Sequence, residues 1–144
     1  MIEKGIAVIG STTIDKIVHR DFSRFKIGGV TTYSGITYSR HGIQTWVLTN
    51  VANRDREIIE RLKQEYIIVC NGQTALTTYF HNLLDDGDDK RRQHILQQAA
   101  PINSHQLSDN LKNVGFVHLG PLHPSDIDVQ AIEISGRFKS LVSV

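Results

Sequence analysis

Short apolar runs recur along the chain and predict the strands of a buried sheet. Each run is continuous rather than alternating with polar residues, which is typical of a strand covered on both faces. The predicted strands are residues 6–9, 44–48, 66–70, 115–119 and 141–144. Because the last run reaches the final residue with no cap or turn after it, we expect the chain to be the front part of a larger fold.

Helical patterns lie between these runs. A helix is predicted at residues 31–41, where Gly42 provides a favourable C-terminal end. Asn53 is the expected N-cap of a second helix with one apolar face, and Ser125 and Asp128 have the spacing of a capping box before a third. Strands that alternate with helices in this way predict an α/β fold with a mostly parallel sheet covered by helices.

Two stretches depart from this alternation. Residues 15–27 have no helical period and contain only short extended pieces. Residues 73–99 have the pattern of a β-hairpin, in which strand-like residues 74–81 and 91–98 flank an acidic turn. That turn contains Asp86-Gly87, a favourable hairpin dipeptide. We therefore expect an antiparallel β flap that stands off the α/β body.

The composition is that of an ordinary globular domain. A chain of 144 residues, 40% of them hydrophobic, is sufficient for one domain with a core that needs no disulfides. Sixteen Lys and Arg against fifteen Asp and Glu leave a net charge of +1, which argues against nucleic acid or a membrane surface as partner. The single Cys70 fits a reducing compartment, and no targeting segment or apolar span of about 18 residues occurs. Cytoplasm is the expected location.

Two features are candidate ligand contacts, and each has a structural alternative. Gly28-Gly29 precedes the first predicted helix, where free backbone N–H groups would favour an oxygen-rich ligand. The same pair could simply form a sharp turn. Asp15 lies among apolar neighbours beyond the first strand, where α/β folds gather ligand contacts, and a carboxylate accepts hydrogen bonds from hydroxyls. It could equally be an exposed strand carboxylate.

The sequence gives little support to other kinds of catalytic, nucleotide-binding or metal site. The sequence has no P-loop, no dinucleotide-binding glycine fingerprint and no nucleophile elbow. The spacing of His118 and His123 matches no common zinc site. The acidic residues at 85–89 lack the pattern of a calcium-binding loop and are best explained as a solvated turn. No metal site and no catalytic residue is therefore assigned.

Several stretches, taken in order, resemble a known family. They are residues 6–11 with Asp15 beyond them, residues 26–42 around the glycine pair, the flap up to Pro101, and residues 116–122. Together they are similar to the ribokinase-like (PfkB) carbohydrate and nucleoside kinases, over nearly the whole chain.

This resemblance implies a partial, Rossmann-like three-layer α/β/α fold with a mostly parallel sheet. A small antiparallel β lid would be formed by about residues 15–27 and 73–99. It also implies ATP-dependent transfer of phosphate to a hydroxymethyl group of a sugar, nucleoside or polyol. Asp15 would hold substrate hydroxyls, Gly28 and Gly29 would lie against the substrate, and the lid would form a homodimer contact.

The resemblance is imperfect at three positions near the implied substrate. Thr13 stands where Asn is frequent, and Tyr33 stands where members often have Asn four residues after the second glycine. Val30 replaces a polar residue of ribose-specific members. The resemblance makes Thr13 and Tyr33 contacts of the substrate. The three differences leave open an acceptor that is larger or less polar than ribose.

The catalytic half of the family pattern is missing. No Gly-Ala-Gly-Asp segment, whose Asp is the family's general base, occurs in the sequence. The residues that bind ATP and Mg²⁺ also belong to that C-terminal half. We therefore expect an N-terminal, substrate-side portion that is inactive alone.

One alternative is a non-catalytic binding or dimerisation module on the same half-fold. Another is a generic Rossmann-like nucleotide binder, against which the absent glycine fingerprint counts.

Overall fold

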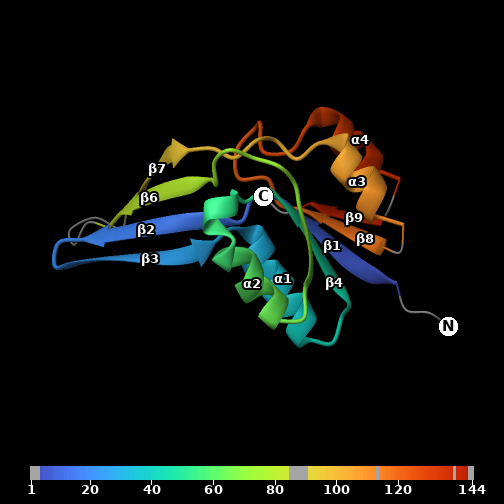
Figure 1. Ribbon diagram of the computed structural model, residues 1–144, viewed down its shortest axis with the longest axis horizontal. Helices are drawn as coiled ribbons and strands as arrows, with labels where there is room; N and C mark the ends of the chain where they lie inside the picture. Colours follow the sequence, from blue (N-terminus) through green and yellow to red (C-terminus); the bar gives the residue numbers. More distant parts are fainter. Residues whose placement is uncertain (1–3, 85–90, 113, 138, 143–144) are drawn as a thin grey trace.

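The computed structural model describes residues 4–84, 91–112 and 114–137, together with the backbone of 139–142. A central sheet with helices on both faces forms the body, and an outer sheet projects from one end of it (Figure 1). No helix in these ranges has the length and apolar character that a membrane span requires.

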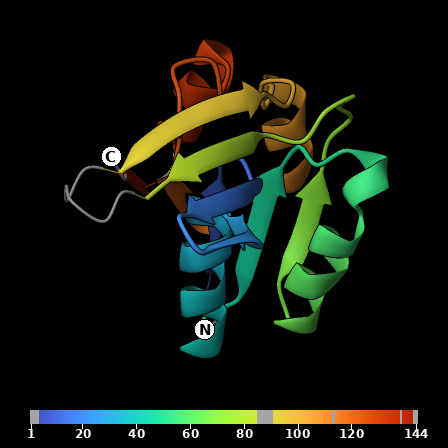
Figure 2. The same ribbon diagram turned by 90° about the vertical axis from the view of Figure 1, so that its left-hand side faces the viewer.

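The central sheet has five strands in the order β5-β4-β1-β8-β9, and all neighbours run parallel. The strands are β1 (Gly5–Ile9), β4 (Thr45–Thr49), β5 (Ile68–Asn71), β8 (Val114–Leu119) and β9 (Lys139–Val142). One face is covered by α1 (Val30–Arg40) and α2 (Glu57–Gln64), the other by α3 (Ser104–Asn110) and α4 (Val129–Ser135) (Figures 1 and 2). The predicted three-layer α/β/α architecture is confirmed.

Burial explains why β1 forms the middle of this sheet. Its apolar side chains alternate between two clusters, so that Ala7 and Ile9 pack toward α3 and α4 while Val8 packs toward α1 and α2. Every residue of β1 and β4 is buried. A strand that is apolar throughout can satisfy both faces only between two layers of helices, as its sequence pattern predicts.

The outer sheet has four strands in the order β3-β2-β6-β7. They are β2 (Thr13–His19), β3 (Phe22–Gly28), β6 (Tyr79–Leu83) and β7 (Arg92–Gln97). The pairs β2·β3 and β6·β7 are antiparallel, as expected of hairpins, but β2 and β6 pair in parallel. The sheet is therefore mixed rather than wholly antiparallel. Both β2 and β6 start beside the central sheet, where Ile14 N–H donates to Thr78 O, and run outward from it.

Two predicted helix starts were wrong in detail. Asn53–Asp55 forms a short 3-10 helix, η1, and α2 starts only after Arg56 because the Asp55 and Arg56 N–H groups bond back to Ala52 and Asn53 carbonyls. Asp128, rather than Ser125, caps α4 by accepting a hydrogen bond from the Gln130 N–H.

Other elements also differ from expectation, among them the last strand, which is β9 at Lys139–Val142 rather than residues 141–144. The strand predicted at 66–70 starts at Ile68, since Tyr66 has a φ of +61° in the turn that ends α2. The first arm of the flap becomes a strand only at Tyr79, and its acidic turn lies outside the described residues. Helix α3 was not predicted, although Asn103 and Gln106 form a reciprocal capping box at its start.

Candidate functional site

The two sheets meet where β1 ends and β2 begins, and this junction holds the predicted ligand contacts. Thr13 and Asp15 project from the same face of β2, because alternate residues of a strand share a face. Thr13 Oγ1 donates a 2.8 Å hydrogen bond to Asp15 Oδ1. Asp15 is only 7% exposed, so its carboxylate is held in one orientation with Oδ2 left for other donors.

The glycine pair lies directly beside this carboxylate. Gly28 pairs with Thr13 across the β2·β3 ladder. A Cβ atom at Gly28 would overlap with Asp15 Oδ2 and lie 2.9 Å from Thr13 Oγ1. Gly29 has a φ of +92°, and a Cβ there would overlap with the Ser11 carbonyl. Both glycines are therefore required by the close approach of backbone and carboxylate.

Buried threonine hydroxyls hold the turn that carries the glycines. Thr32 Oγ1 donates to Gly28 O at 2.8 Å, and Thr31 Oγ1 donates to Ser11 O at 3.2 Å. Thr31 and Thr12 hydroxyls lie 2.7 Å apart and share a hydrogen bond. These bonds tie the start of α1 to the end of β1, so the turn is fixed relative to Asp15.

These residues open onto a cavity of about 360 Å³ that is bordered by the outer sheet, the start of α1 and the loop after β8. That size is within the range of small-molecule sites. It is lined by Thr13, Asp15, Lys26, Gly29, Val30, Tyr33, Ser34, Phe80, Arg91, Gln93 and Leu122. Of the five predicted contacts, Thr13, Asp15, Gly29 and Tyr33 line the cavity, and Gly28 packs behind the carboxylate.

Apart from Val30, the sequence analysis did not single out the remaining lining residues. Phe80 and Gln93 come from the outer sheet and Leu122 from the loop after β8, segments far from Asp15 in the chain. No local pattern in the sequence marks them. Only the pairing of β2 with β6 brings Phe80 opposite Asp15.

The cavity lining carries one carboxylate, Asp15, and two cations, Lys26 and Arg91, whose protein partners are neutral. Lys26 Nζ lies 5.1 Å from the centre of the Tyr33 ring, and Arg91 donates hydrogen bonds of 3.0 and 3.2 Å to Asn82 Oδ1. The carboxylate therefore remains the acceptor available for hydroxyl groups, beside the apolar ring of Phe80.

Asp126 supports the floor of the cavity and was also missed. Its buried carboxylate accepts hydrogen bonds from the Ser11 N–H and Oγ and, at 3.0 Å, from the Leu122 N–H. His123 Nε2 lies 3.6 Å away. The carboxylate thus joins the end of β1 to the loop after β8, which places Leu122 in the cavity wall.

No three His, Cys, Asp or Glu side chains of the described residues gather in a group that could coordinate a metal ion. The Mg²⁺ that the family resemblance implies therefore has no such donor set in these ranges, and no step is assigned to it or to the nucleotide.

Known structures share this architecture over almost the whole chain. One is a pyrophosphate-dependent kinase in the ribokinase family, complexed with a pyrophosphate analogue and myo-inositol. It has a TM-score of 0.82 and 21% identity, and covers 95% of this chain. The fold is that of the ribokinase-family kinases.

Two further structures show how widely the ribokinase fold is matched. An uncharacterized sugar kinase from Pyrococcus horikoshii has a TM-score of 0.72 with 18% identity over 96% of this chain. Adenosine kinase from Sinorhizobium meliloti has a TM-score of 0.76 with 11% identity over 98%. The chain spans 47%, 54% and 56% of the three structures, about half of each. No protein-family model and no curated protein sequence matches it.

Proposed function

We propose that this chain is the acceptor-binding portion of a kinase that phosphorylates a polyol, sugar or nucleoside. The observation that carries the proposal is the Thr13–Asp15 pair, held beside Gly28 in a cavity bordered by the outer sheet and the start of α1. The outer sheet would be the lid over the acceptor. In the myo-inositol complex a protein of this fold holds a cyclic polyol, which makes such an acceptor the first to test.

The recognition follows from the geometry of the carboxylate. Asp15 Oδ1 already accepts from Thr13, so Oδ2 and the remaining lone pairs would accept two ligand hydroxyls. Hydrogen bonds to an ionised, buried acceptor contribute about 1.5–3 kcal/mol each, enough to select hydroxyl-bearing ligands. Phe80 and Tyr33 would pack against the apolar face of the ring of a sugar or polyol.

Phosphoryl transfer needs more than this chain supplies. It depends on a base, cations and anion-binding donors that are held together around the transferred group. We expect no transfer from either ATP or pyrophosphate by the 144-residue chain alone, because the sequence has no Gly-Ala-Gly-Asp segment. Formation of a phosphorylated acceptor in a panel of sugars, polyols and nucleosides would contradict this part of the proposal.

Acceptor binding is tested directly by calorimetry and by NMR with myo-inositol, ribose and adenosine. We expect at least one of them to bind and to shift the amide signals of Thr13, Asp15 and Gly29. Asp15→Asn removes the charge and is expected to weaken binding by about tenfold or more. The matched control is Asp21→Asn, an exposed acid in the turn between β2 and β3.

Gly28→Ala gives a second, steric test. The added methyl group would displace the Asp15 carboxylate, so binding should be lost while the fold persists. The proposal is wrong if no hydroxyl-bearing ligand binds, or if the Asp15 and Asp21 variants bind equally well.

We also propose that the outer sheet mediates homodimerisation. Its edge strand β7 is exposed along most of its length, and exposed edge strands present unpaired backbone groups to another chain. Light scattering on the chain and on its Leu96→Pro variant tests the idea, because Leu96 is an exposed β7 residue outside the Asp15 cavity. If both proteins are monomers, the proposed homodimerisation is wrong.

The cytoplasmic location stays a prediction.

A further inference from the structure

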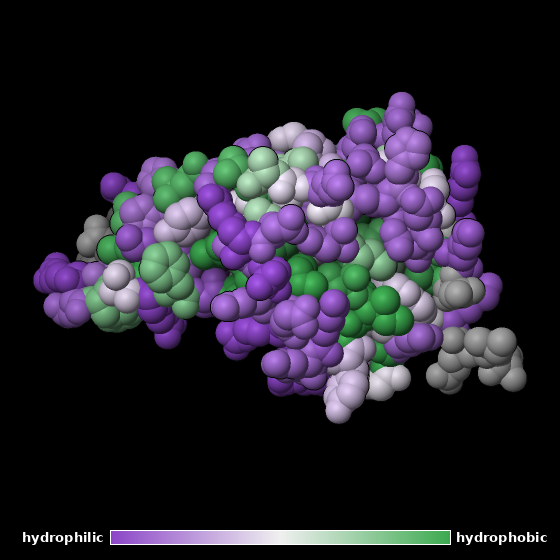
Figure 3. All heavy atoms as spheres, in the orientation of Figure 1, coloured by the Kyte–Doolittle hydropathy of each residue, from purple (hydrophilic) through white to green (hydrophobic). Residues whose placement is uncertain are grey.

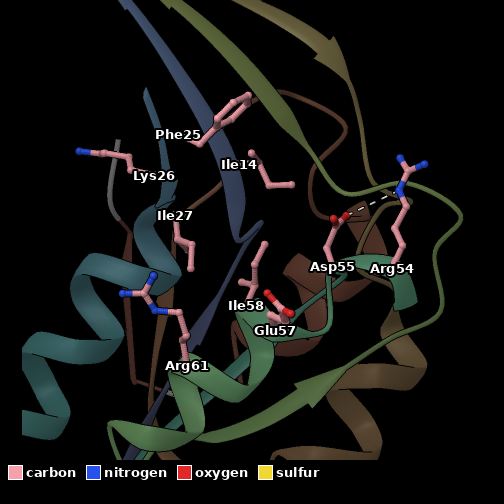
Figure 4. A pocket seen from close by; sticks show the side chains of 9 residues that line it. All are labelled: Ile14, Phe25, Lys26, Ile27, Arg54, Asp55, Glu57, Ile58 and Arg61. Carbon is pink, nitrogen blue, oxygen red and sulfur yellow. Dashed lines mark ion pairs between the residues drawn. The ribbon is translucent and has the colours of Figure 1, made fainter. Parts of the chain in front are cut away.

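A second cavity lies on the opposite face of β2 from Asp15. Its volume is about 300 Å³, and it is bordered by the outer sheet, η1 and α2. Figure 4 shows Ile14, Ile27 and Ile58 gathered in its middle, with Phe25 above them and Arg61 at one side. Because Ile14 alternates with Thr13 and Asp15 along β2, one strand separates the two cavities.

The floor of this cavity is apolar, and its side chains pack against the protein core. Ile14 and Ile27 pack against the buried side chains of Val51, Ile58 and Ile59. Phe25 borders the cavity and is 64% exposed, so its ring is accessible to a ligand. A ligand with an apolar body would therefore meet a preformed surface.

Two cations beside this floor, Arg61 and Lys26, form no ion pair with a described residue. Arg61 forms no ion pair with any residue in the described ranges, and it also lines the adjoining cavity of about 280 Å³ between β3, α1 and α2. Lys26 lines both cavities too, but its Nζ lies toward the Tyr33 ring, so Arg61 is the main group for binding an anion.

Most nearby acids, in contrast, are already engaged. Asp55 Oδ2 accepts a 2.6 Å hydrogen bond from Thr77 and lies 3.8 Å from Arg54. Glu65, in the adjoining cavity, forms a two-bond pair with Arg40 that lowers the pKa of this carboxyl. Only Glu57, one turn before Arg61 on α2, has no ion pair among the described residues.

From this arrangement we propose a second ligand site, which binds a small amphipathic carboxylate. Its apolar body would lie on Ile14, Ile27, Ile58 and Phe25, and its carboxylate would pair with Arg61. A guanidinium matches a carboxylate in a two-bond geometry, and an apolar floor with one fixed charge is the usual composition of a small-molecule site. The site does not include Asp15, although Lys26 lines both this cavity and the Asp15 cavity.

The test uses octanoate as the probe. Octan-1-ol has the same alkyl chain without the charge, and acetate has the charge without the alkyl chain. Calorimetry on the full 144-residue chain should show octanoate binding more tightly than either control. Arg61→Gln should weaken octanoate about fivefold and leave octan-1-ol unchanged, since it removes one partly exposed ion pair. The matched control is Lys63→Gln on the same helix, outside both cavities.

Two further variants sharpen the result. Glu57→Gln should tighten octanoate, because it removes the one competing carboxylate, whereas Phe25→Ala should weaken octanoate and octan-1-ol alike. NMR methyl signals of Ile14, Ile27 and Ile58 should shift with octanoate. Equal binding of octanoate and octan-1-ol, equal effects of the Arg61 and Lys63 variants, or shifts confined to the Asp15 cavity would each overturn the proposal.

Discussion

The central and outer sheets of this protein are stabilised in different ways. In the central sheet all residues of β1 and β4 are buried between two helical layers. In the outer sheet most residues of β3 and β7 are exposed, and the sheet projects from the body (Figure 1). Figure 3 shows apolar side chains gathered over the middle of the molecule, with mainly hydrophilic ones at its two ends.

The outer sheet is attached to the body by Ile14 and Ile27, which pack against the body, and by hydroxyl groups at its root. Thr78 Oγ1 accepts a 3.0 Å hydrogen bond from the Ala99 N–H and donates to Ser11 Oγ. Thr77 Oγ1 accepts from the Ala52 N–H at 2.9 Å. Apolar burial thus holds the central sheet, while a few buried polar bonds orient the outer sheet. The central sheet therefore provides most of the stability, whereas the outer sheet provides many of the residues that line the ligand cavity.

The largest effect is expected in the central sheet. Leu48→Ala in β4 deletes a fully buried side chain and should lower the free energy of unfolding by about 2–5 kcal/mol. Urea denaturation followed by circular dichroism measures it. A loss below about 1 kcal/mol would contradict the view that apolar burial in this sheet dominates stability.

A smaller effect is expected at the root of the outer sheet. Thr78→Val keeps the volume but leaves the Ala99 N–H buried without its acceptor, which should cost about 1–3 kcal/mol. The matched control is Thr37→Ala, whose exposed hydroxyl bonds only within α1, and it should change stability by less than about 0.5 kcal/mol. Equal effects of the two variants would remove the special role of the root.

The third prediction concerns pH and the central sheet. Burial lowers the pKa of His118, whose Nδ1 lies 2.9 Å from the Tyr38 hydroxyl. The unfolded chain therefore binds this proton more readily. The contribution to stability is complete above the ordinary His pKa of about 6.5 and is lost as pH falls toward the lowered value. His118→Gln should flatten the fall in stability between pH 7 and 5, measured by urea denaturation, and an unchanged slope would contradict this.

The smallest stability effect is expected on the exposed outer sheet. Phe25→Ser removes a side chain that contacts Tyr79 at a ring distance of 6.3 Å but is largely exposed. The free energy of unfolding, measured by thermal unfolding, should fall by no more than about 0.5 kcal/mol. A larger loss would show that apolar burial also stabilises the outer sheet, and the contrast between the sheets would fail.

Much of the fold could be predicted because its signals are local. The continuous apolar runs identify β1, β4 and β8, and Gly42 marks the end of α1 correctly. Helix starts were less accurate, since η1 before α2 depends on backbone bonds that no sequence spacing encodes. Helix α3 had a usable signal, the Asn103–Gln106 capping box, which the sequence analysis overlooked.

The sequence by itself determined the central strands, three of the four α-helices and the presence of a carboxylate and two glycines at strand ends. Periodicity and turn chemistry act within a few residues, so they can be read along the chain. Tertiary structure alone decided that β2 pairs in parallel with β6, that Phe80 and Leu122 join Asp15, and that Arg61 faces Ile14. Those contacts join residues tens of positions apart, and only packing of the two sheets determines which of them meet.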